Sequence, residues 1–323
     1  MNNFLKYNNS INDSYLIDLA VPIIDILAPI KYSPNKKFDN RYFFTCIIDF
    51  IKNSTYWSRY KGFIDYPING KYLNEIHNRY IKKGVYEAIN KQLLNIYLKK
   101  NKSVKIKNQI IDSSFVPNKG GSIKNNNHLL NDNVKKNNKI IRKKNNTEKN
   151  YKNKIKEETF IDYNKYNGRK KYFKVSTITD SFGIPLGTSI ISSKQSDNIS
   201  IEQTINSIQV NLNTLKNSNN NRYKQYILAD SGYCSNKNKF LLKSKGYIPI
   251  IIYNKRNTKN KKIIAQNALN KNERFRYKKR KIIESFFSWI KYFPVINQNY
   301  QKSISSYKGL FLLASSILIS KKI

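Results

Sequence analysis

Residues 276–292 read RYKKRKIIESFFSWIKY and predict a helix with two chemically different faces. The segment has neither Gly nor Pro, and it is long enough for about four helical turns. At about 100° per residue, one stripe of the helix is apolar and should pack into a core. That stripe consists of Ile283, Phe286, Phe287 and Ile290. One side of this helix is therefore expected to be anchored against the rest of the protein.

A second stripe of the same helix is polar and carries a single carboxylate. It consists of Tyr277, Arg280, Glu284 and Lys291, which lie within about 60° of each other in projection. Glu284 follows Arg280 by one turn, so the simpler interpretation is an i, i+4 ion pair on a solvated face. The alternative is that the helix presents Glu284 as a metal ligand. The choice depends on which other carboxylates the fold brings near it.

The composition indicates a folded protein with a strongly basic surface. The chain has 323 residues, of which 39% are hydrophobic and 13% aromatic, enough for a large core. Its net charge of +40 favours nucleic acid as the partner, with an anionic membrane surface as the second candidate. Part of this bias has a simpler source, because AT-rich coding sequences also enrich a chain in Lys, Asn, Ile and Tyr.

Several classes of protein are disfavoured by the sequence. The two Cys and two His are scattered, which gives neither a zinc spacing nor a disulfide framework and favours a reducing compartment. The apolar segments 16–30 and 310–319 are too polar or too short to cross a bilayer, which needs about 20 apolar residues. We therefore expect an intracellular protein, in the cytoplasm or the nucleus depending on the host, with no membrane partner.

Residues 1–100 are expected to form a small all-α domain. Arg41–Lys52 predicts a strongly apolar helix, and two further helices, Asn69–Lys83 and Val85–Leu98, are separated by Gly84. Tyr, Lys and Arg on the surface of such a bundle would suit contact with DNA. A domain that only packs against the rest of the chain fits the same pattern.

Residues 101–323 are expected to form an α/β domain with a mixed sheet and helices on both faces. Five segments predict strands: Val104–Ile111, Lys170–Thr179, Ile184–Ser192, Tyr226–Ala229 and Ile248–Tyr253. Three predict helices besides residues 276–292: Ser200–Lys216, opened by a capping box with Gln203, then Asn238–Lys245 and Tyr307–Ile319. At about residues 118–160 lies an Asn- and Lys-rich basic insertion, expected to be of low complexity and loosely ordered.

Two aspartates follow predicted strands, and the fold is expected to bring them close to Glu284. Asp112 and Asp230 are each placed at the carboxyl end of a strand, where open α/β sheets form their sites. Each one alone is more simply a turn residue. Three converging carboxylates would repel one another unless a divalent cation lay between them, and oxygen ligands select Mg²⁺ or Mn²⁺. Two such ions about 4 Å apart can clamp both oxygens in phosphoryl transfer.

The spacing Tyr277-x2-Arg280-x3-Glu284-x6-Lys291 resembles the Y-R-E-K motif of bacterial insertion-sequence transposases of the DDE class. Five other segments are similar to motifs of that family, and together they extend the resemblance over roughly residues 38–318 apart from the insertion. They are IIDSSFV (110–116), GRKKYFKVSTITDSFGIPLG (168–187), LADSGYCS (228–235), and TYWSRY with RYIKKGVYEAI (55–60 and 79–89). Cys234 departs from the family, which often has Asp there, and it is expected to be buried.

The resemblance implies a ribonuclease-H-like catalytic domain behind a helical DNA-binding domain. Asp112, Asp230 and Glu284 would be the catalytic, metal-binding triad with Mg²⁺ or Mn²⁺. The DNA-binding residues would be Tyr277, Arg280 and Lys291. The reaction would be cleavage at transposon ends followed by strand transfer into target DNA, in a synaptic complex of a homodimer. A domesticated, catalytically inactive DNA-binding protein and a ribonuclease-H-like nuclease that does not join strands are the alternatives.

Overall fold

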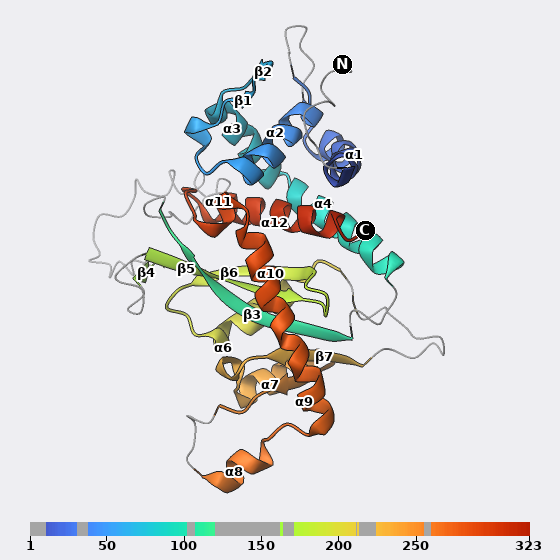
Figure 1. Cartoon of the computed structure of the whole chain (residues 1–323), viewed down its shortest axis with the longest axis vertical. Helices are drawn as coiled ribbons and strands as arrows, with labels where there is room; N and C mark the ends of the chain where they lie inside the picture. The colour runs from blue at the N-terminus through green and yellow to red at the C-terminus, as the bar shows by residue number, and fades with distance from the viewer. Residues whose placement is uncertain are drawn as a thin grey trace, which may run out of the picture.

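The computed structural model describes residues 11–30, 38–101, 107–119, 162–163, 171–210, 212, 224–254 and 260–323. The chain has a helical part and a part built around one sheet, and α4 and α12 lie between them (Figure 1). From residue 120 onward, the insertion expected at about 118–160 lies outside the described residues. Among the helices within the described ranges, none is long and apolar enough to span a membrane.

The first hundred residues are mainly helical, as expected. Their elements are α1 (Ile11–Leu27), α2 (Asn40–Asn53), η2 (Trp57–Arg59), β1 (Gly62–Phe63), β2 (Tyr66–Pro67), α3 (Gly70–Lys82) and α4 (Val85–Lys100). Asp39 caps α2 by accepting the backbone N–H of Tyr42, and the buried aromatic and aliphatic side chains of α2 face the core. Gly84 separates α3 from α4 with φ +67°, a left-handed conformation that favours glycine.

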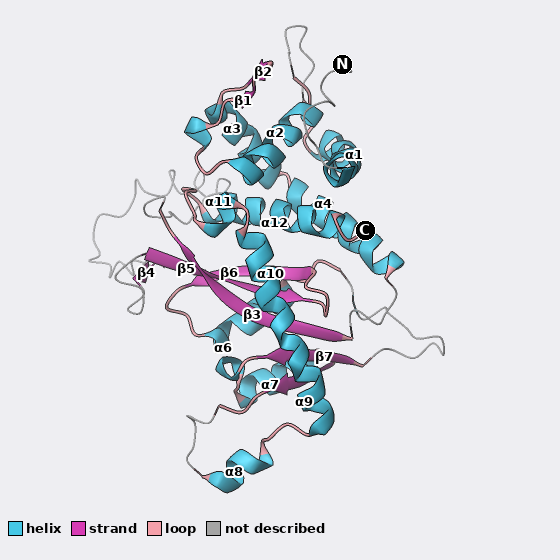
Figure 2. Cartoon of the chain, viewed as in Figure 1, coloured by secondary structure: helices cyan, strands magenta, loops and turns pink. Residues whose placement is uncertain are grey.

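A six-stranded mixed sheet forms the second part (Figure 2). Its strands are β3 (Asn108–Pro117), β4 (Asp162–Tyr163), β5 (Lys171–Thr179), β6 (Pro185–Ser192), β7 (Gln225–Ala229) and β8 (Tyr247–Ile251). The order is β4-β5-β3-β7-β8, with β6 also paired to β5. The β5 strand pairs antiparallel with β3, β4 and β6, whereas β3, β7 and β8 run parallel to one another. The expected ribonuclease-H-like mixed sheet is confirmed.

Helices cover both faces of this sheet. Successive residues of a strand point to opposite faces, so the contacts of neighbouring residues show which helix covers which face. Their bounds are α6 (Asp197–Asn206), η6 (Ser231–Tyr233), α7 (Asn236–Ser244), α8 (Lys261–Gln266), α9 (Lys271–Tyr277), η8 (Lys278–Lys281), α10 (Ile282–Lys291), α11 (Pro294–Asn297) and α12 (Ile304–Ser320). On β5, Phe173 packs edge-on against Tyr307 of α12, with ring centroids 4.9 Å apart. Three residues along, Ser176 accepts a hydrogen bond from Thr204 of α6. The α6 and α12 helices therefore lie on opposite faces.

Two boundaries close to Asp112 differ from the sequence expectation. Asp112 is not at the end of its strand, because β3 continues to Pro117 while β5 pairs with it along residues 172–179. The α6 helix starts at Asp197 and ends at Asn206, so the expected helix Ser200–Lys216 with its capping box is wrong. Ser200 lies inside the first turn, where its hydroxyl donates to the carbonyl of Asp197. After Asn206 the chain leaves the helix to run beside β6, where Gln209 donates to Leu186.

The α12 helix joins the helical part to the sheet. It is buried along most of its length and packs against α4 and α1 as well as β6. One continuous cluster of buried side chains therefore runs from α1 through the sheet to α12. The division of the chain at residue 100 and the DNA-binding role of residues 1–100 stay predictions.

A buried histidine lies where α3 meets α12. His77 forms hydrogen bonds of 2.7 Å with the Tyr86 hydroxyl and 3.0 Å with the Ser306 hydroxyl, and its ring lies beside Trp57. Burial lowers the pKa of His77 to about 3, because no charged group among these contacts compensates for the imidazolium. The folded protein therefore keeps His77 neutral at pH values where the unfolded chain protonates it.

Acidification should weaken this joint between the two parts. The stability that neutral His77 contributes is complete above its unfolded pKa of about 6.5 and is lost progressively as the pH falls toward the folded value. At pH 5 the loss is about 2 kcal/mol. Urea unfolding at pH 7 and pH 5 measures it, with His77→Gln as the comparison. An equal pH dependence in the wild type and the variant would contradict the prediction.

Candidate active site

The helical segment that carries the polar stripe is continuous from α9 through η8 to α10. It begins at Lys271, five residues before the expected start, because Asn270 and Glu273 form a capping box. The expected core stripe is present in α10. Ile283, Phe286 and Ile290 are buried, and Phe287 packs half-buried against the same core.

Asp112 and Asp230 are neighbours where the parallel strands β3 and β7 stop pairing. The last register pair between β3 and β7 joins Ile111 to Ala229, so Asp112 is the next residue of β3 and Asp230 is the first residue after β7. One oxygen of each carboxylate accepts the backbone N–H of the following residue, at 2.8 Å from Ser113 and 2.6 Å from Ser231. The second oxygen of each carboxylate is not used by these local bonds. The aspartates therefore meet where the parallel pairing of β3 ends, although β3 itself continues.

Negative charge is concentrated at this point. Burial raises the pKa of Asp112, and the charges of Asp230 and Asp197 raise it further. The Ser113 N–H and the Arg280 guanidinium act in the opposite direction, without cancelling the increase. A cation placed beside Asp112 would relieve this repulsion.

Arg280 links the first aspartate to the glutamate. Its Nη1 donates to Asp112 Oδ2 at 2.8 Å, and its Nη2 lies 3.4 Å from Glu284 Oε1. Burial disfavours the charge of the guanidinium, but the neighbouring acidic groups outweigh that effect and raise the pKa of Arg280. Asp112 and Glu284 contact the same guanidinium group, so the side chain of Arg280 lies between the two carboxylates.

The other two residues of the polar stripe also face the sheet. Lys291 Nζ donates to the hydroxyl of Ser114 at 2.7 Å, and partial burial lowers the pKa of its ammonium group. Burial also raises the pKa of Tyr277, whose half-buried phenol lies beside Arg280. Asp112 and Ser114 are two residues apart on β3 and share the face that α10 covers. Arg280 thus meets β3 at Asp112, and Lys291 meets it two residues further along at Ser114.

The structure brings most, but not all, of the predicted site residues close together. Asp112, Asp230, Tyr277 and Arg280 interact with one another, whereas Glu284 contacts this group through Arg280. The Glu284 side chain is 63% exposed. Within the described ranges, no group of three or more His, Cys, Asp or Glu side chains is arranged to hold a metal ion. The roles predicted for these residues therefore stay predictions.

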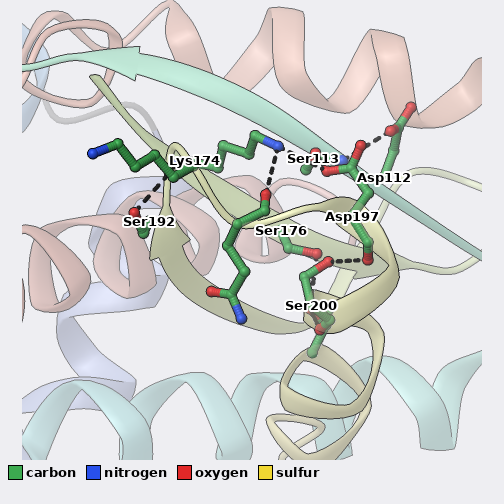
Figure 3. A network of polar contacts seen from close by, with 10 residues as sticks. Asp112, Ser113, Lys174, Ser176, Ser192, Asp197 and Ser200 are labelled. Carbon is green, nitrogen blue, oxygen red and sulfur yellow. Dashed lines mark hydrogen bonds and ion pairs between the residues drawn. The ribbon is translucent and has the colours of Figure 1, made fainter. Parts of the chain in front are cut away.

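Three polar residues near Asp112 were not anticipated from the sequence. Ser113 and Lys174 both donate to Asp197 Oδ1, at 2.8 and 3.2 Å, on the face of the sheet opposite α10 (Figure 3). Lys174 carried a recognisable signal, because a lysine flanked by Phe173 and Val175 is unusual in an otherwise apolar strand. Asp197 was missed because the helix was expected to begin three residues later. Cys234, beside the second aspartate, is buried as expected.

A family model described as a transposase DDE domain matches residues 107–319, which include the whole sheet and the helices that cover it. The chain belongs to the DDE transposase family. This membership confirms the family resemblance drawn from the motifs and a function in DNA transposition, with the DNA binding and recombination that transposition involves. The Y-R-E-K spacing within the transposase stays a prediction.

The structure is similar to the piggyBac transposase in a cryo-EM structure of its synaptic complex with hairpin DNA, with a TM-score of 0.45 and 8% sequence identity. That match covers 96% of this chain and 73% of the other. No curated protein matches the chain.

The position of α10 depends on a glycine in the β5–β6 turn. Gly183 has φ +80°, and a Cβ added there would lie 2.9 Å from the Trp289 ring of α10. Asp180 shapes the same turn by accepting the N–H groups of Phe182 and Ile184 and the hydroxyl of Tyr97. A side chain at Gly183 would therefore both strain the turn and push α10 away from it.

Gly183→Ala should destabilise the transposase more than a matched glycine substitution. Gly246→Ala is the control, because Gly246 has φ +83° with no atom within 4 Å of an added Cβ. Backbone strain alone should cost about 1–2 kcal/mol in the control. The Gly183 variant should lose about 1–3 kcal/mol more through its contact with Trp289. Equal free energies of unfolding in urea would show that the turn does not constrain α10.

Proposed function

We propose that the transposase cleaves DNA at transposon ends and then joins the freed 3′-hydroxyl to target DNA. The proposal assigns Asp112, Asp230 and Glu284 as the catalytic carboxylates. The observation that carries it is the juxtaposition of Asp112 and Asp230 after the last register pair of β3 and β7, with Arg280 bonded to the first. Sites of α/β sheets form where parallel strands end, so this is the expected place for chemistry.

The donor atoms at this point fit a divalent cation. Asp112, Asp230 and Glu284 offer only carboxylate oxygens, which suit Mg²⁺ or Mn²⁺. Burial raises the pKa of Asp112, and the neighbouring acidic charges raise it further. That second effect supports the assignment, because excess negative charge favours a bound cation. When bound, such ions would supply Lewis-acid stabilisation of the attacking and leaving oxygens of a phosphodiester.

The two contacts of Arg280, with Asp112 and Glu284, suggest its role in this proposal. A DNA phosphate near the aspartates would compete with Asp112 and Glu284 for the guanidinium, because Arg binds phosphate through the same planar fork. Glu284 is largely exposed, so its side chain is free to change rotamer once Arg280 turns to the phosphate. Arg280 would thereby hold the DNA and release Glu284 toward the aspartates.

Lys291 and Tyr277 would position the same strand of DNA. Lys291 meets β3 two residues beyond Asp112, where its ammonium group is bonded to the neutral Ser114 hydroxyl. That ammonium has no carboxylate partner among the ion pairs of the described residues, so it keeps its charge for a phosphate. The overall charge of +40 favours binding of DNA over the wider surface. Joining two transposon ends would require two copies of the chain.

Glu284→Gln should abolish Mg²⁺-dependent cleavage of a transposon-end duplex, because an amide cannot replace the carboxylate as an anionic ligand. Asp112→Asn and Asp230→Asn should behave in the same way. Glu273→Gln is the matched control on the same helical segment, since Glu273 only caps α9 and should leave cleavage unchanged. Nicking of labelled end DNA, with and without Mg²⁺, measures all four variants.

The alternatives give different results in the same assays. A domesticated DNA-binding protein would bind DNA in a salt-sensitive way without Mg²⁺-dependent nicking by the wild type. A nuclease that does not join strands would nick the duplex but fail to transfer a pre-cut end to target DNA. Cleavage that survives Glu284→Gln would contradict the role assigned to Glu284.

Lys291→Ala should weaken DNA binding and lower its dependence on salt. Loss of one phosphate contact reduces the slope of log K against log salt concentration by about 1. Lys237→Ala is the control, because Lys237 is an exposed lysine on α7, which packs with α6 on the opposite side of the sheet. Fluorescence anisotropy at several salt concentrations measures both slopes. Equal slopes for the two variants would show that Lys291 does not contact a DNA phosphate.

A further inference from the structure

A partly buried ion pair lies behind the aspartates, on the face of the sheet that α6 covers. Lys174 Nζ is 3.2 Å from Asp197 Oδ1, and the side chains are only 9% and 33% exposed (Figure 3). Lys174 also donates to the Gln195 carbonyl at 2.9 Å, and its ammonium lies 5.0 Å from the centre of the Phe115 ring. A buried lysine needs such partners, because its charge is costly to remove from water. The pair is therefore a specific structure and not a surface contact.

Asp197 touches both of the segments that carry the aspartates. Its Oδ1 accepts a hydrogen bond of 2.8 Å from Ser113, the residue after Asp112. Its other oxygen, Oδ2, faces Gly232, two residues after Asp230, where an added Cβ would lie 3.5 Å away. A Cβ at position 232 would be in ordinary van der Waals contact with this carboxylate. The Asp197 side chain therefore lies between the first-aspartate strand and the second-aspartate turn.

The position of Asp197 near the two aspartates explains why a cation such as Lys174 is needed beside it. Asp197 accepts a hydrogen bond from Ser113, the residue after Asp112, so its charge lies near that aspartate. A third acid beside two aspartates would disfavour the folded arrangement unless a cation compensated for it. Lys174 supplies that cation from β5, the strand that pairs with β3 on the side away from β7. The ion pair thereby ties β5, β3 and η6 together through the start of α6.

We propose that Lys174 and Asp197 are positioning residues, which hold Asp112 and Asp230 at the separation needed to bind a divalent cation. This inference rests on the proposed function, since it assigns the cation to those aspartates. Neither side chain is proposed to touch DNA or the metal. Their effect is transmitted by Ser113 and by the Gly232 backbone.

Binding of Mn²⁺ to the full chain without DNA tests this proposal. Loss of a residue that orients metal ligands typically weakens metal binding about 10- to 100-fold. Asp197→Ala and Lys174→Met should show a loss of this size, measured by the paramagnetic resonance of free Mn²⁺. Lys174→Arg should keep most of the affinity, because it preserves the charge. The Mn²⁺ concentration for half-maximal cleavage should rise in parallel.

Asp13→Asn is the matched control for a structural effect. Asp13 is a buried carboxylate paired with Lys52 in the helical part, away from the sheet. Its loss should lower the melting temperature and leave Mn²⁺ binding unchanged. If Asp197→Ala does not fold, Ser113→Ala removes only one hydrogen bond to the pair and should weaken Mn²⁺ binding in the same direction.

The outcomes separate this inference from the proposed function. Asp112→Asn should abolish Mn²⁺ binding, and wild-type binding in that variant would overturn the function itself. If Asp112→Asn loses binding while folded Asp197→Ala and Ser113→Ala bind Mn²⁺ like the wild type, the positioning role is wrong. A lower melting temperature in Asp197→Ala without weaker binding would also overturn it.

Discussion

The pairing of β3 with two different neighbours organises the candidate site. On one side β3 is antiparallel to β5 along eight register pairs, and on the other it is parallel to β7 over four. The longer pairing keeps β3 extended past the point where β7 turns away. Asp112 is therefore held in a regular strand while Asp230 opens a turn beside it. A carboxylate in a strand has a fixed direction, which suits a residue that must be preorganised.

The alternation of side chains along β3 then divides the polar groups into two layers. Asp112 and Ser114 meet Arg280 and Lys291 on the α10 face, while Ser113 meets Asp197 on the α6 face. The α10 layer carries Asp112 with Arg280 and Lys291, the groups proposed to bind metal and phosphate. The α6 layer carries an ion pair whose charges cancel. The acids and cations that remain for a ligand therefore lie on the α10 face.

Sequence patterns predicted the members of this site better than their surroundings. The strand before Asp230 and the apolar stripe of α10 followed from periodicity, because burial imposes a period of two or of about 3.6 residues. The end of β3 did not, since only pairing with β5 extends that strand beyond Asp112. The start of α6 also failed, because Ser200 imitates an N-cap while its hydroxyl bonds inside the first turn. Contacts such as Asp197 with Gly232 depend on tertiary packing and leave no periodic signal.

The 3₁₀ segment η8 explains why the polar stripe remains aligned despite an irregular helix. A uniform α-helix places Tyr277 about 60° from Arg280, whereas a 3₁₀ turn of three residues brings them into line. Residues 278–281 adopt that tighter turn, and Tyr277 and Arg280 are indeed neighbours. From Ile282 the regular α-helix resumes, so Lys291 still lies three turns beyond Arg280 on the same side. The tighter turn thus moves only the tyrosine, and it places the phenol directly against the guanidinium that contacts both Asp112 and Glu284.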